Sequence, residues 1–160
     1  MLVGEQPGDE EDTRGEPFVG PAGRVLDAAL DEAGVPRTEV YVTNAVKHFK
    51  HEPRGKWRIH KKPDAAEVRA CRPWLEAEIR SVAPKVIVCL GATAAQALLG
   101  PQARVGTAAA PVASPWGAST LITYHPSAVL RARDSSSRAE MRARLVHDLA
   151  LARRLALQDK

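Results

Sequence analysis

Residues 85–91, Lys85-Val86-Ile87-Val88-Cys89-Leu90-Gly91, decide the fold. The central five residues are apolar without interruption, a pattern typical of a β-strand that is covered on both faces. Gly91 then leads into Ala92–Leu99, which we expect to be a helix. A strand buried on both faces needs a layer of helices on each side of its sheet. The stretch therefore predicts the centre of a sheet that lies between two helical layers.

The segments on either side alternate between strand and helix patterns. Further strands are predicted at 2–3, 40–43 and 119–124, and further helices at 21–33, 64–82 and 137–157. Asp64 is suited to cap the helix that follows it, and Pro73 should kink or interrupt that helix. Strands that alternate with helices favour parallel pairing. We expect an α/β protein, a three-layer αβα sandwich with a central, mainly parallel four-stranded sheet, formed by residues 1–160 as one domain.

Composition sets wider bounds. The chain has 160 residues, of which 44% are hydrophobic and 26% charged, and these values are ordinary for a globular protein. Its formal charge of +4 permits a polyanionic partner without requiring one. There is no long apolar run, which argues against a membrane partner, and the two cysteines lie far apart. We expect a cytoplasmic location with reduced thiols, and nothing in the sequence suggests anything other than a monomer.

Polar residues gather where the predicted strands end. In a parallel sheet, ligands bind beyond the carboxyl ends of the strands. Four residues fall at these ends, namely Glu5, Asn44, Gly91 and His125. The sequence therefore predicts a site at this edge of the sheet.

The segment Arg54-Gly55-Lys56-Trp57-Arg58-Ile59-His60-Lys61-Lys62-Pro63 carries five cationic side chains, one histidine and no acid. Glycine and proline near its ends predict a loop. Neighbouring cations should lower the pKa of His60, so that its imidazole is neutral and nucleophilic at pH 7. The same cations suit a phosphate backbone, and composition alone favours phosphate contact over nucleophilic attack for His60.

Several blocks in this order resemble the uracil-DNA glycosylase superfamily. They are Gly4-Glu5-Gln6-Pro7-Gly8, Pro17-Phe18-Val19-Gly20-Pro21-Ala22-Gly23, Thr43-Asn44, Leu90-Gly91-Ala92-Thr93-Ala94 and His125-Pro126-Ser127. The first two resemble family 4, the iron–sulfur branch. The basic segment resembles the UdgX-type branch, whose members stay covalently attached to uracil-containing DNA through a loop histidine.

This resemblance implies roles for particular residues. Phe18 would stack on a flipped uracil, Asn44 would read its edge, and Gln6 would position the loop or the base. His125 would donate to uracil O2, and Glu5 or Asp9 would stabilise the sugar cation or activate water. His60 would attack C1′ and cross-link the protein to the DNA. Candidate DNA-backbone contacts are Lys56, Arg58, Lys61, Lys62, Ser127 and Arg131, and Leu130 or Arg131 would fill the gap left by the flipped nucleotide.

The family 4 resemblance also implies a [4Fe–4S] cluster. Cys71 matches one ligand, and His48 stands where another is expected. The two remaining cysteines would precede the first strand, so we expect an N-terminal segment to be lacking, the cluster site to be incomplete, and the loop between His48 and Cys71 to be poorly ordered. Cys89 is expected to be a core residue.

The sequence leaves two other functions open. One is an ordinary family 4 hydrolase that turns over and releases abasic DNA, and the other is a non-catalytic nucleic-acid-binding remnant. For either enzyme the expected partner is uracil-containing DNA, with single strands preferred.

Overall fold

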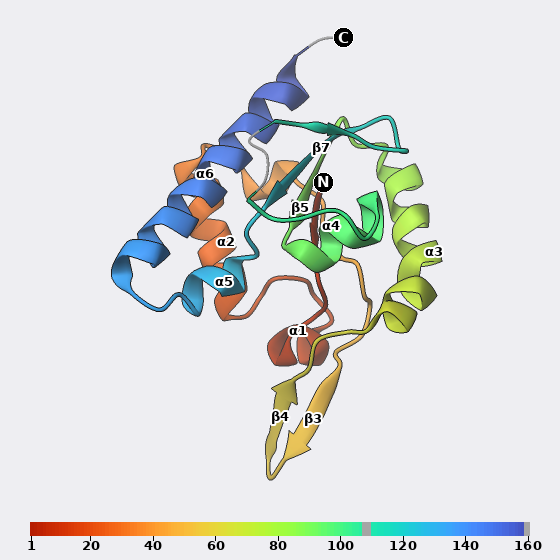
Figure 1. Ribbon diagram of the computed structural model, residues 1–160, viewed down its shortest axis with the longest axis vertical. Coiled ribbons are helices and arrows are strands. Elements are labelled where there is room, and N and C mark those ends of the chain that lie inside the picture. Colours follow the sequence, from red (N-terminus) through yellow and green to blue (C-terminus); the bar gives the residue numbers. More distant parts are fainter. Residues whose placement is uncertain (107–109, 159–160) are drawn as a thin grey trace.

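The computed structural model describes residues 1–106 and 110–158, and its centre is a mostly parallel sheet in the order β2-β1-β5-β7-β6 (Figure 1). The parallel strands are β1 (Leu2–Gly4), β2 (Val42–Asn44), β5 (Val86–Leu90) and β7 (Ser119–Thr123). The expected fold class is confirmed. Within the described ranges the sheet has five strands rather than four, because the two-residue β6 (Val112–Ala113) pairs antiparallel with β7. β6 is exposed and too short to show a pattern in sequence.

Side chains of β5 alternate between two cores. Val86, Val88 and Leu90 pack with α2 (Pro21–Glu32) and α6 (Ser135–Leu157). Ile87 and Cys89 pack on the other face with α3 (Ala65–Val82) and α4 (Ala92–Leu99). Burial raises the pKa of the Cys89 thiol to about 12, so this cysteine is an inert core residue, as expected.

The long helices follow the predicted segments. Asp64 caps α3, since its side chain accepts a hydrogen bond from the backbone N–H of Glu67. Pro73 lies inside an unbroken α3, so the predicted interruption is wrong. The proline lies on the exposed face of the helix, and buried Leu75 and Ile79 anchor the helix beyond it. The short elements α1 (Asp9–Arg14), η1 (Arg37–Glu39) and α5 (Pro126–Leu130) occupy segments for which no helix was predicted.

The basic segment is a β-hairpin, and the predicted loop is wrong. Strands β3 (His51–Arg54) and β4 (Trp57–His60) pair antiparallel, with Arg54 opposite Trp57. Gly55, with φ of +59°, lies in the two-residue turn between them. The β-formers Trp57 and Ile59 favour strand over loop. The hairpin extends from the sheet end near α1, and β4 runs back toward α1 (Figure 1).

Among the described residues, no helix combines the length and the apolar character needed to cross a membrane.

Candidate active site

A pocket of about 470 Å³ opens at the carboxyl ends of the parallel strands, between α1, α5 and the hairpin. All seven residues that the sequence predicts to act in catalysis or uracil binding line it: Glu5, Gln6, Asp9, Phe18, Asn44, His60 and His125. Ser127, Leu130 and Arg131 from α5 and its C-terminal end also line it. Lys56, Arg58, Lys61 and Lys62 do not.

Phe18 is held against the strand end by two glycines. Its backbone is left-handed, with φ of +54°, and its ring is buried. A Cβ on Gly4 would lie 2.6 Å from the ring, and a Cβ on Gly23 would lie 1.9 Å from the Phe18 carbonyl oxygen. Only glycine leaves room for this loop at positions 4 and 23, which accounts for a glycine in each of the blocks 4–8 and 17–23. Holding a residue other than glycine in this region costs about 1–3 kcal/mol, and such strain is common at ligand sites.

Glu11 holds the same loop together, a role the sequence did not indicate. Its carboxylate accepts hydrogen bonds from the backbone N–H groups of Gly8, Val19 and Gly20. In sequence it belongs to an acidic run at residues 9–12, which favours a solvated face over a structural role.

Asn44 has an unsatisfied acceptor at the pocket wall. The residue is buried at the end of β2, and its Oδ1 finds no donor among the described residues. Buried polar atoms are almost always paired, so an orphan beside a cavity is typical of a ligand site. An amide offers both an acceptor and a donor, which suits the Watson–Crick edge of a pyrimidine.

Glu5 links α4 to the hairpin. The hydroxyl of Thr93, in the first turn of α4, donates to Glu5 Oε2 at 2.5 Å, and Glu5 Oε1 lies 3.3 Å from His60 Nε2. A carboxylate from β1 therefore lies beside His60, in addition to the cations of its own segment. The fold brings in Glu5 from β1, which the local sequence of the hairpin cannot reveal. Thr93 was also missed as a candidate, although it lies within the Leu90–Ala94 block.

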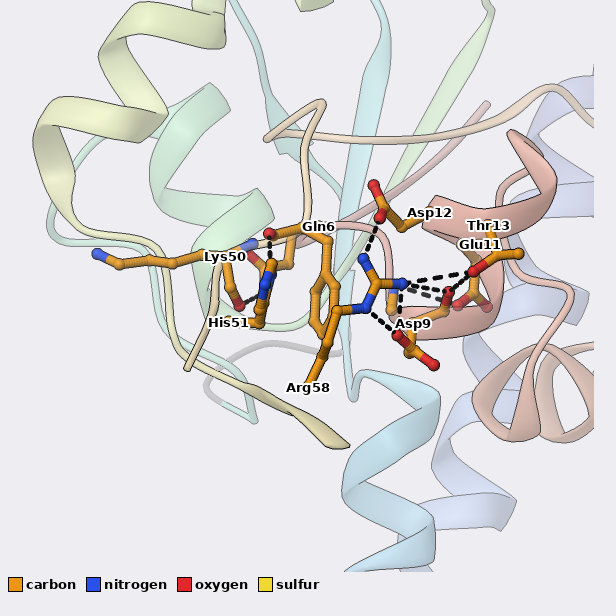
Figure 2. Close-up of polar contacts among 10 residues, drawn as sticks. Gln6, Asp9, Glu11, Asp12, Thr13, Lys50, His51 and Arg58 are labelled. Carbon is orange, nitrogen blue, oxygen red and sulfur yellow. Dashed lines mark hydrogen bonds and ion pairs between the residues drawn. The ribbon is translucent and has the colours of Figure 1, made fainter. Parts of the chain in front are cut away.

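Two further contacts fasten the hairpin. The Gln6 amide donates to the carbonyl oxygens of Lys50 and Lys61, one on each side of the hairpin, and Gln6 Oε1 accepts from the N–H of Lys50 (Figure 2). The Arg58 guanidinium binds Asp9 at 2.5 Å and Asp12 at 2.6 Å (Figure 2). These side chains thus bond the hairpin to the core.

The pairing of Arg58 involves two residues with expected roles, Arg58 as a DNA contact and Asp9 as a catalytic carboxylate, and both roles stay predictions. The Arg58 guanidinium pairs with Asp9 and Asp12 of α1, and it lies 5.2 Å from the centre of the Phe49 ring. Its carboxylate partners raise the pKa of the guanidinium, with the hydrogen bond to Asp12 as the largest contribution. Of the two predicted carboxylates, Asp9 is thus paired with Arg58, and Glu5 lies beside His60.

The imidazole of His125 is uncharged at neutral pH, and its Nε2–H is free to donate a hydrogen bond. Burial lowers its pKa to about 4. It caps α5, and its Nδ1 accepts a hydrogen bond from the backbone N–H of Ser127 at 3.0 Å. Because Nδ1 is the acceptor, the proton of the neutral ring is on Nε2. Ser127, predicted to bind phosphate, holds this ring in its tautomer.

The two predicted metal ligands are adjacent, since Cys71 Sγ lies 3.7 Å from His48 Nδ1. Cys71 also accepts a hydrogen bond from the backbone N–H of Lys47. In the described ranges no cluster of three or more histidine, cysteine or acidic side chains is arranged to bind a metal. These residues therefore do not fit a four-ligand [4Fe–4S] site by themselves.

Comparison with known proteins agrees with this geometry. The family profile of the uracil DNA glycosylase superfamily matches residues 1–150. A type-4 uracil-DNA glycosylase of Pyrobaculum aerophilum is 37% identical over 82% of this chain and 67% of its own length. Those of Thermotoga maritima and Archaeoglobus fulgidus are 37% and 36% identical, over 86% and 81% of this chain and 69% and 66% of their own lengths. The chain spans about two thirds of the length of these relatives. It belongs to the uracil-DNA glycosylase superfamily.

Proposed function

We propose that this protein excises uracil from DNA and is then captured on the abasic sugar through His60. The excision step is supported by the superfamily membership and by relatives that are uracil-DNA glycosylases. The capture step is carried by one observation: His60 Nε2 lies 3.3 Å from Glu5 Oε1 at the wall of the pocket. A nucleophile and the carboxylate that would stabilise the sugar cation thus lie side by side.

The pocket suits a flipped uracil. Phe18 offers a ring for stacking, and Asn44 offers its unsatisfied oxygen and its amide N–H₂ to the base edge. Cleavage of the glycosidic bond sends its electron pair to uracil, and the base leaves as an anion. The Nε2–H of His125 donates to uracil O2 as this charge develops. With a pKa of about 4, His125 keeps the same protonation state throughout the neutral range.

Glu5 and His60 act on the sugar. Loss of uracil leaves an oxocarbenium-like carbon at C1′, which the Glu5 carboxylate stabilises. A ring nitrogen of His60 then supplies its electron pair to C1′, and the C1′–N bond forms. The product is an N-glycosyl imidazolium whose positive charge lies beside Glu5, while the uracil anion takes a proton from solvent. A positioned imidazole has a large effective concentration compared with water.

A turnover hydrolase is the second candidate, and the relatives favour it because they are type-4 uracil-DNA glycosylases. In that case Glu5 activates a water molecule, and the half-exposed His60 serves as a lining residue.

Single-stranded DNA with one uracil and an end label, analysed on a denaturing gel after heating, separates these functions. Capture predicts a heat-stable protein–DNA band that is absent for His60→Ser. Abasic product without such a band supports the hydrolase. Salt-sensitive binding with neither product nor preference for uracil would support a non-catalytic module.

A further inference from the structure

The hairpin has a second face that the reaction does not use. Successive side chains of a strand point to opposite faces. Arg58 and His60 point toward α1 and Glu5, so Trp57 and Ile59 occupy the other face of β4. They are 64% and 41% exposed. Two large apolar side chains on a projecting hairpin form a surface patch that the fold does not need.

Cations surround this patch. Arg54 is the cross-strand partner of Trp57, and Lys56 Nζ lies 5.2 Å from the centre of its ring. Among the described residues, acids neutralise Lys50 and Arg58 of the same region. In the same ranges no ion pair is recorded for the exposed cations Arg54, Lys56, Lys61 and Lys62. The hairpin thus presents an aromatic ring with Arg54 and Lys56 beside it, and its one acid, Glu52, lies opposite Ile59 on the same face.

From this combination we propose that Trp57 is a stacking platform for an unpaired base of the DNA strand that carries the uracil, with Arg54 and Lys56 contacting the adjacent phosphates. Positive charge favours a polyanion over an apolar protein partner, and an exposed indole favours a strand whose base faces are free. The inference rests on the proposed function and specifies its substrate as single-stranded DNA. Trp57 is three residues from His60, about 10 Å along β4, so the stacked base lies close to the reacting nucleotide.

Binding of uracil-free oligonucleotides tests the platform independently of catalysis. We would compare a thymine oligonucleotide with one of equal length in which abasic spacers replace the bases, using fluorescence anisotropy and quenching of indole emission. For Trp57→Ala we expect at least a fivefold rise in Kd on the thymine strand and little change on the abasic strand, since only bases can stack. Trp57→Phe should restore most of the affinity. The matched control is Trp74→Ala on α3, where the side chain is 68% exposed and lies away from the hairpin, and it should bind like wild type.

Thymine-specific quenching that disappears in Trp57→Phe would support the platform. Equal losses on both oligonucleotides, or no loss for Trp57→Ala, would overturn it. Dimerisation without DNA that Trp57→Ala abolishes would also overturn it, because the patch would then bind a second copy of the chain. If uracil-containing DNA is neither cleaved nor captured while the quenching remains, the proposed function fails and the stacking contact stands.

Discussion

Replacing Asn44 with alanine should raise the stability of the free protein or leave it unchanged, and should slow the release of uracil. In the free protein, Asn44 Oδ1 is buried without a donor among the described residues. An unsatisfied buried polar group costs about 1–3 kcal/mol, which the substitution removes. Truncation also loses about 1 kcal/mol of burial. We therefore expect the free energy of unfolding of the variant to exceed that of the wild type by zero to about 2 kcal/mol.

Activity should change in the other direction. If the amide makes two hydrogen bonds to uracil, their loss costs about 1–3 kcal/mol in total, or about 5- to 150-fold in the rate of uracil release. Thermal unfolding and single-turnover release from labelled DNA measure the two quantities. For a chain of this size the midpoint should rise by no more than about 8 °C.

Leu90→Ala is the matched control, since Leu90 is fully buried, lines the same pocket and has no polar group. It should lower stability by about 2–5 kcal/mol. If Asn44→Ala were destabilised to a similar degree, the amide would be satisfied in the free protein. Retained uracil release in Asn44→Ala would show that this residue does not read the base.

Three further outcomes follow from the site. Thr93→Val removes the only described hydrogen bond to the Glu5 carboxylate and should slow single-turnover uracil release by about tenfold or more. Thr93→Ser should restore the rate, and equal rates for both variants would exclude a positioning role. The pKa of His125 is about 4 in the folded protein against an ordinary value of 6.5, so the unfolded chain binds the proton more readily, and the free energy of unfolding should fall by about 3 kcal/mol as the pH drops from about 6.5 to 4. Urea titrations at several pH values should show a weaker pH dependence of stability for His125→Gln. The same pH dependence in this variant and the wild type would contradict the low pKa of His125. Gln6→Ala should loosen the hairpin, which faster hydrogen exchange of the β4 amides would show, and it should lower the ratio of cross-linked to free abasic product. An unchanged ratio despite faster exchange would show that the position of the hairpin does not control capture.

The sheet and its long helices could be predicted because their signals are local. The apolar run 86–90 and the cap at Asp64 depend on neighbours within one element, and the structure contains both. The residues at the strand ends also meet as expected, since parallel strands bring their carboxyl ends to one edge. β6 could not be predicted because two exposed residues carry no periodicity.

Contacts between residues that are distant in sequence could not be predicted. From its own segment, His60 is surrounded by cations, yet the fold places Glu5 beside it. The composition of its segment predicts a phosphate contact for Arg58, and it does not reveal the ion pairs of Arg58 with Asp9 and Asp12. The acidic run and the basic hairpin lie far apart in sequence, and only the fold shows that Arg58 of the hairpin pairs with Asp9 and Asp12 of α1.

The central claim is capture through His60, and counting uracil released per protein molecule tests it most directly. With excess single-stranded substrate, the account predicts a rapid release that stops at about one uracil per active protein, with an equal amount of heat-stable adduct. His60→Ser should release uracil without that limit or form no adduct. Steady release of many uracils by the wild-type protein, with no adduct, would contradict capture and leave an ordinary glycosylase.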